Sequence, residues 1–123
     1  MNKISKHQYN SRIGLISDAG SPLISDPGYK LVKDYIDKKI FVTSVPGPSS
    51  VIASIQLSGM PTNNFAFFGF LPKSNKKIDD LLENIENTKM TSVVFVSGKN
   101  LKNLIKKIVN IDEKKTISIC KEL

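Results

Sequence analysis

Short apolar runs rich in β-branched and aromatic residues alternate along this chain with longer segments of helical periodicity. The expected strands are residues 13–17, 40–45, 65–71, 92–97 and 116–120. The expected helices between them are residues 27–39, 48–59, 76–87 and 101–109. Because parallel strands need long crossover connections, usually helices, this alternation predicts an α/β fold with at least partly parallel sheets.

A short linker, MPTNN at residues 60–64, interrupts the alternation. It separates a βαβα half from a βαβαβ half. We therefore expect residues 1–60 to be part of an N-terminal α/β lobe and residues 61–123 to be part of a C-terminal α/β lobe.

Composition narrows the class of protein. The chain has 123 residues, of which 40% are hydrophobic and 24% charged, as in one ordinary globular domain. It has no apolar run near the roughly 20 residues that cross a bilayer, and its polar N-terminus lacks a signal-like apolar stretch, so we expect a cytoplasmic protein with no membrane partner. With one cysteine, Cys120, and one histidine, His7, we expect neither a disulfide framework nor a metal site.

The net charge of +7 suits a polyanionic partner such as RNA. The alternative is that the lysines only solvate exposed helix faces, as charged residues usually do.

The turn after the first expected strand is LISDAGSPLISDPG at residues 15–28. In open α/β sheets, ligands bind at the carboxyl ends of the strands. Gly20 permits close approach of a backbone to a ligand, Ser21 offers a hydroxyl, and Asp18 and Asp26 offer acceptors. Alternatively, these serines and aspartates only form local turns and helix caps.

A second turn of small residues, VPGPSS at residues 45–50, follows the next expected strand and opens the next helix. The topology places it on the same sheet edge, where two such turns indicate a nucleoside-sized pocket. The nucleophile elbow, the dinucleotide fingerprint and the phosphate-loop motif are all absent from the chain.

The stretches LISDAGSPLISDPGYKLV and VPGPSSVIASIQLSGMPTNNFAFFGFLP resemble the ribosomal RNA small subunit methyltransferase I family. This family belongs to the tetrapyrrole methylase superfamily of S-adenosylmethionine-dependent enzymes. The resemblance runs from about residue 13 to residue 123. It implies two αβα lobes with the cofactor in the cleft between them, the N-terminal lobe being incomplete here and the C-terminal lobe truncated.

The resemblance also implies a reaction and its partners. The expected reaction is ribose 2′-O-methylation of a cytidine in the RNA of the small ribosomal subunit. The superfamily often dimerises, so a homodimer is a further expectation. The implied cofactor-binding residues are Gly20, Ser21, Pro22, Leu23, Ser49, Ser50, Phe95, Val96 and Ser97.

The identity of the catalytic residues stays open. A ribose hydroxyl is a poor nucleophile, so a base or a hydrogen-bond acceptor should assist it. Asp18, Asp26 and Lys99 are candidates by residue type alone, and the alternative is that both aspartates are structural.

The chain departs from the family in two places. Family members are more than twice as long and begin with a strand and a glycine-proline-rich loop, where residues 1–12 here indicate a helix remnant or an altered start. Residues 95–100, FVSGKN, stand where the family reads Tyr-Glu-Ser-Pro-His-Arg. We therefore expect this fragment to be inactive alone. Two alternatives stay open: a corrin or porphyrin precursor methyltransferase of the same fold, and a non-catalytic remnant that binds RNA weakly.

Overall fold

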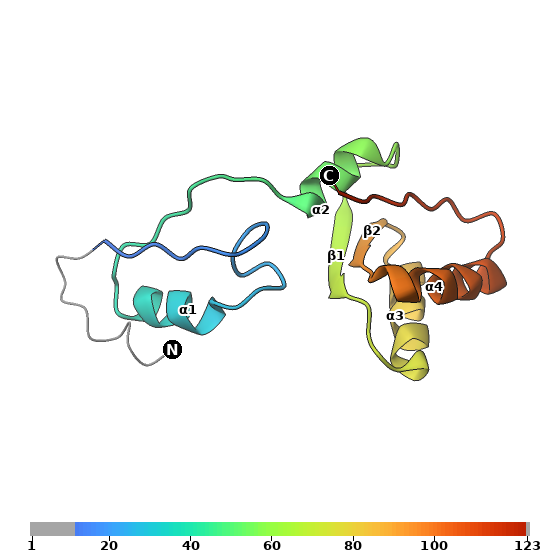
Figure 1. Cartoon of the computed structure of the whole chain (residues 1–123), viewed down its shortest axis with the longest axis horizontal. Helices are drawn as coiled ribbons and strands as arrows, with labels where there is room; N and C mark the ends of the chain where they lie inside the picture. The colour runs from blue at the N-terminus through green and yellow to red at the C-terminus, as the bar shows by residue number, and fades with distance from the viewer. Residues whose placement is uncertain (1–11, 123) are drawn as a thin grey trace. The chain divides into compact units, whose positions relative to one another are not determined.

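The computed structural model describes residues 12–122 (Figure 1). These residues form α1 (Tyr29–Asp37), α2 (Ser50–Leu57), β1 (Phe65–Phe70), α3 (Asn75–Thr88), β2 (Thr91–Phe95) and α4 (Gly98–Ile111). The chain divides into two compact units between Pro46 and Gly47. The expected helix remnant at residues 1–12 lies almost wholly outside the described residues, and the lobe division at residues 60–64 stays a prediction.

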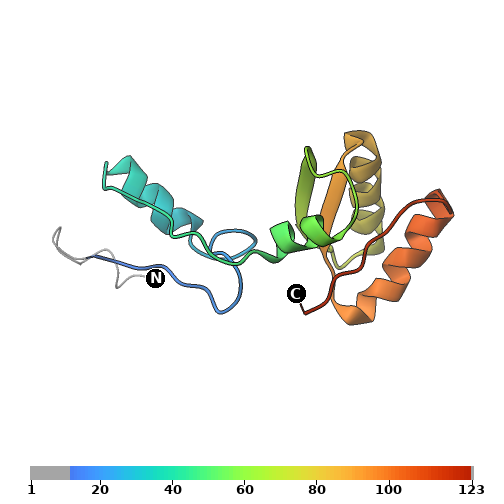
Figure 2. The same ribbon diagram turned by 90° about the horizontal axis from the view of Figure 1, so that it is seen from above.

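In the second unit, β1 and β2 lie side by side and run parallel (Figure 2). Phe65 pairs with Thr91, and the register shifts between Phe67 and Phe70. Gly69 lies in this shift with φ of 72°, a left-handed conformation that glycine adopts without steric cost. With α3 as the crossover between the two strands, the expected α/β character with a parallel sheet is confirmed.

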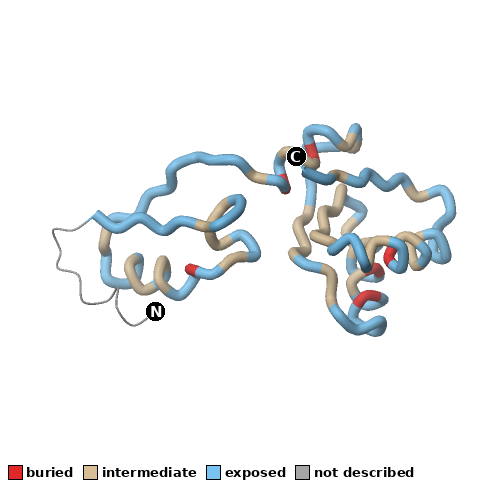
Figure 3. The backbone as a smooth tube through the Cα atoms, viewed as in Figure 1, coloured by how far each residue is buried: buried red, intermediate tan, exposed pale blue. Residues whose placement is uncertain are grey.

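The core of the second unit lies between α3 and α4. Ile78, Leu82 and Leu104 are buried there, and Figure 3 shows the buried positions along the backbone. Partly buried apolar side chains pack around them, namely Leu71, Ile85, Val96 and Ile108. The expected helices at residues 76–87 and 101–109 are therefore confirmed, because their apolar residues recur at the spacing that faces one core.

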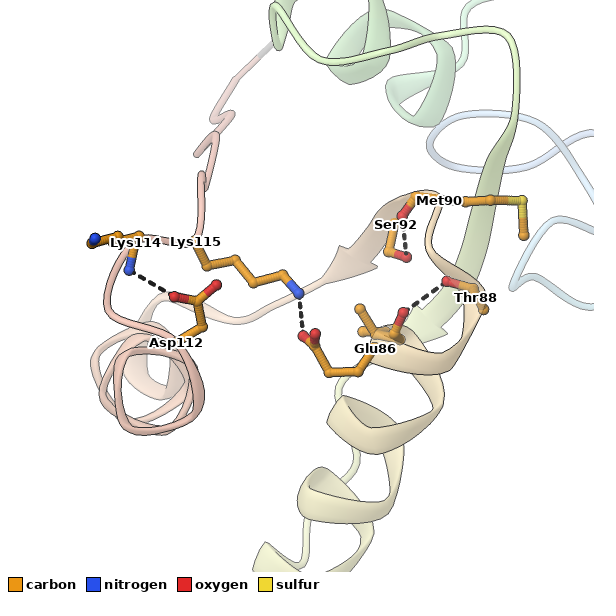
Figure 4. Close-up of polar contacts among 8 residues, drawn as sticks. Glu86, Thr88, Met90, Ser92, Asp112, Lys114 and Lys115 are labelled. Carbon is orange, nitrogen blue, oxygen red and sulfur yellow. Dashed lines mark hydrogen bonds and ion pairs between the residues drawn. The ribbon is translucent and has the colours of Figure 1, made fainter.

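Polar contacts show that α3 and the α4 region run parallel, with partners 28 or 29 residues apart. The Asn103 amide donates to Asn75 at 3.5 Å, 28 residues away in sequence. Lys107 pairs with Asp79 at 2.5 Å across the same 28-residue separation. Lys115, just after α4, pairs with Glu86 across 29 residues (Figure 4).

The expected strands at residues 13–17, 40–45 and 116–120 are wrong for this structure. All three segments lack regular secondary structure, and within residues 12–122 the sheet consists of β1 and β2 alone. A strand needs a neighbour that accepts and donates backbone hydrogen bonds, and none is provided to these segments here. Their side chains are accordingly exposed, to 89% at Ile16, 87% at Phe41 and 88% at Val45.

Two expectations about helices change in detail. The helix expected at residues 27–39 is shorter in the structure, because α1 begins at Tyr29 with Gly28 as its N-cap, which leaves Pro27 outside the helix. The helix expected at residues 48–59 is α2, Ser50–Leu57, which buries Val51 and Ile55 while Leu57 is 68% exposed. Among the described residues, no helix combines the length and the apolarity that crossing a membrane requires.

Candidate functional site

The first turn holds an unusual concentration of left-handed backbone. The φ angles are 71° at Gly20, 70° at Leu23 and 56° at Ser25. Residues other than glycine rarely adopt positive φ, and such strain clusters at ligand-binding and active sites. The turn therefore motivates the hypothesis that residues 18–26 belong to a binding site, and this role stays a prediction.

Gly20 and Gly28 both have positive φ, but their surroundings differ. A Cβ added at Gly28, where φ is 130°, would lie 2.7 Å from Leu15 Cδ2. A Cβ added at Gly20 would meet no protein atom within 4 Å. Packing within the chain thus explains why Gly28 lacks a side chain, whereas the open space beside Gly20 is what close approach of a ligand requires.

The polar groups of this turn differ in exposure. Asp18 is exposed, whereas Asp26 is half-buried, as are Ser21 and Leu23. Within residues 12–122, neither aspartate forms an ion pair. Ser17 uses its hydroxyl locally and donates to the carbonyl of Ala19 at 2.9 Å. The expected local turn chemistry is thus present, while Asp18 keeps a carboxylate accessible to a substrate.

The second turn leads into α2. Ser49 is the N-cap, and its hydroxyl accepts a hydrogen bond from the Ile52 amide at 3.5 Å. Ser50 is the first helical residue and is exposed. The Ser49 side chain therefore caps α2, and a cofactor role for these two serines stays a prediction.

The third group of expected site residues follows β2. Phe95 ends the strand, and its ring centroid lies 4.9 Å from that of Phe67 and 5.2 Å from that of Phe70. Val96 packs on the core of the second unit. Ser97 is the N-cap of α4 but makes no capping hydrogen bond, so its exposed hydroxyl is not used by the helix.

The structure brings Phe95, Val96, Ser97 and Lys99 together at the junction of β2 and α4. Gly20–Leu23 belong to the first unit, so their joining with the other groups into one cofactor site stays a prediction. Sequence reasoning missed the aromatic neighbours of Phe95, although four phenylalanines in FAFFGF offered a signal. It also missed the left-handed backbone at Leu23 and Ser25, because neither residue type is one that typically adopts positive φ.

Residues 5–123 match the model of the family described as Tetrapyrrole (Corrin/Porphyrin) Methylases. The chain belongs to this family. The fold of the second unit, a parallel sheet with a helical crossover, agrees with that membership.

Several curated relatives of this tetrapyrrole methylase chain carry the name Ribosomal RNA small subunit methyltransferase I. The chain is 40% identical to the one from Halalkalibacterium halodurans over 90% of its own length and 38% of the relative's. It is 40% identical to the Rickettsia prowazekii protein over 90% of its own length and 40% of the relative's. It is 36% identical to the Buchnera aphidicola protein over 98% of its own length and 42% of the relative's. The chain thus spans about two fifths of the length of these relatives.

Proposed function

We propose that this chain is part of an S-adenosylmethionine-dependent methyltransferase that acts on small-subunit ribosomal RNA. The observation that carries the proposal is the likeness, over as much as 98% of the chain, to relatives named for that activity. The proposal includes a cytoplasmic location, where the ribosomal substrate would be met, and a homodimer, which sedimentation of the protein would test.

The features of the first turn and of the β2–α4 junction support a cofactor role. The open space at Gly20 and the exposed backbone around it suit a ligand held mainly by main-chain groups. The exposed Ser97 hydroxyl, which makes no bond to its own helix, is available to a polar group of the cofactor. Bound S-adenosylmethionine supplies a methyl group activated by its positively charged sulfur, so the chain's main task is to position the acceptor.

The finer proposal is ribose 2′-O-methylation of a cytidine. The acceptor hydroxyl must lose its proton as it is methylated, and a carboxylate can take that proton. Asp18 is the better placed of the two aspartates because it is exposed, whereas Asp26 is half-buried. Lys99 offers donors and no acceptor, which suits it to a phosphate group rather than to the role of base.

The first test is a methyl-transfer assay with the product of the complete gene. Small ribosomal subunits that lack the modification would be incubated with labelled S-adenosylmethionine, and the label would be mapped by nuclease digestion and mass spectrometry. We expect one 2′-O-methylated cytidine. Label on a base would contradict the proposal, as would label in a porphyrin precursor offered in a parallel reaction with none in RNA.

The second test addresses the cofactor turn. Gly20→Val should lower the affinity for S-adenosylmethionine at least tenfold in calorimetry, because its side chain enters the space proposed for the cofactor. Gly59→Val is the matched control, since Gly59 has nearly the same φ (70° against 71°), a Cβ there also meets no atom within 4 Å, and this residue lies outside the proposed site. Equal affinities in the two variants would remove Gly20 from the site.

Asp18→Asn tests the proposed base. We expect it to lower kcat by about 10²–10⁴-fold, the usual contribution of general base catalysis. The control is Asp80→Asn, which neutralises an exposed acid on α3. If both variants kept the activity of the wild type, Asp18 would be structural.

A further inference from the structure

The helix α4 carries lysines without acidic residues. Its 14 residues, GKNLKNLIKKIVNI, include four lysines and neither aspartate nor glutamate. The neighbouring α3 contains two lysines and four acidic residues, so the two parallel helices differ in the sign of their net charge. Such segregation concentrates positive charge on one element and indicates an anionic partner.

Three of the α4 lysines lie on one face. Lys99, Lys102 and Lys106 are exposed and separated by three and four residues, the spacing at which side chains share a helix face. Seven residues of helix span about 10 Å, so the three ammonium groups follow the helix in a row. We call this row the lysine stripe.

The stripe lacks the ion pairs that neutralise other lysines of the chain. Lys107, the fourth lysine of α4, pairs with Asp79 of α3. In α1, Lys33 pairs with Asp37, and Lys38, the residue after the helix, pairs with Asp34, each four residues away. Within residues 12–122, by contrast, the structure gives the ammonium groups of the stripe no ion pair.

The position of Lys99 is unfavourable for the helix itself. It lies in the first turn of α4, which contains no acidic residue. The amide end of a helix carries partial positive charge and is stabilised by acids, so a lysine there works against helix stability. The same arrangement adds to the attraction for an anion, since the helix end and the lysine act with the same sign.

We propose that the lysine stripe binds the phosphate backbone of the RNA substrate. The inference rests on the proposed function and names the surface that holds the RNA. The polar face of α4 combines the stripe with Asn103 and Asn110, which suits phosphates and sugar hydroxyls. A membrane surface fits less well, because the apolar face of α4 is used in the core through Leu104 and is not available to lipid.

Salt dependence of binding tests the proposal. Affinity of the complete gene's product for a single-stranded RNA oligonucleotide would be measured by fluorescence anisotropy between about 50 and about 200 mM salt. Each phosphate contact on a single strand contributes about 0.7 to the slope of log K against log salt. Replacing all three stripe lysines by Gln should therefore reduce the slope by about 2.

A double variant and a matched control sharpen the test. Because Lys99 is also near the proposed cofactor site, Lys102→Gln with Lys106→Gln should by itself reduce the slope by about 1.4. The control is Lys33→Gln with Lys38→Gln, which removes the same charge from lysines that are already ion-paired. If the double variant and the control changed the slope equally, the proposal that the lysine stripe binds RNA phosphates would be refuted.

The outcomes distinguish a failure of the RNA-binding inference from a failure of the proposed methylation reaction. If the wild type methylates ribosomal RNA but the stripe variants change the salt slope no more than the control does, this inference is refuted and the proposed function stands. No methylation, with the slope reduced only in the stripe variants, would keep the stripe as an RNA surface and refute the reaction. Loss of binding to phosphatidylserine vesicles with an unchanged RNA slope would assign the stripe to a membrane instead.

Discussion

Truncation of Leu82 should expose how far the second unit depends on its small core. Leu82 is 4% exposed and lies in the cluster with Ile78 and Leu104. Leu82→Ala removes three buried carbons, worth about 2.4 kcal/mol at about 0.8 kcal/mol per buried CH₂. A residual cavity would add to this loss, within a usual total of about 2–5 kcal/mol. The surrounding side chains of this cluster are only partly buried and can move into the space, so we expect about 3 kcal/mol.

The assay is urea unfolding followed by far-ultraviolet circular dichroism. Leu57→Ala is the matched control, because Leu57 is 68% exposed and its loss should cost less than about 0.5 kcal/mol. If Leu82→Ala leaves the second unit unfolded in water, Ile78→Val carries the test with an expected loss of about 0.5–1.5 kcal/mol. Equal stability of Leu82→Ala and Leu57→Ala would show that α3 is not held by this core.

Two further predictions concern local backbone and capping. Gly28→Ala should destabilise α1 by about 1–3 kcal/mol, because alanine is strained at φ of 130°, whereas Gly14→Ala should be neutral or slightly stabilising, as amide hydrogen exchange would reveal. Ser49→Ala should lower stability by about 0.5–2 kcal/mol through loss of the α2 cap. Ser97→Ala should lower stability by less than Ser49→Ala in the same urea titration, because the Ser97 hydroxyl makes no capping bond. Equal losses in the two serine variants would contradict this distinction.

The elements that the sequence predicted well are those whose signals are local and whose partners lie close in the chain. The expected helix at residues 76–87 is α3, Asn75–Thr88, and the expected strand at residues 92–97 overlaps β2, Thr91–Phe95. Their partners follow within about thirty residues, as the register of β1 with β2 shows. The strand expected at residues 40–45 has an equally strong β pattern, but a pattern provides no hydrogen-bonding neighbour.

The candidate site was predictable in its residue types and not in its backbone. Small residues after a strand-like run pointed to the turn around Gly20, but leucine rarely adopts positive φ, so the strain at Leu23 could not be foreseen. Ser49 and Ser97 are the same residue at the same helical position, and only Ser49 caps its helix. The side-chain torsion that decides this depends on the surroundings, which periodicity and spacing do not report.

The two glycines of the first turn separate stability from ligand binding. The structure of the chain itself explains why residue 28 is glycine, since both its φ and its closeness to Leu15 disfavour any side chain. At Gly20 only the positive φ favours glycine, because the space beside it is open. Gly20→Ala should therefore cost no more than the backbone strain of about 1–2 kcal/mol, with no added clash. A loss of S-adenosylmethionine affinity in the folded Gly20→Ala protein that exceeds the loss in Gly59→Ala, whose glycine has nearly the same φ of 70° and open space beside it, would then arise where the new methyl group meets the ligand. A folded variant that kept full affinity would move the cofactor away from this turn and leave the strain at Leu23 without a functional explanation.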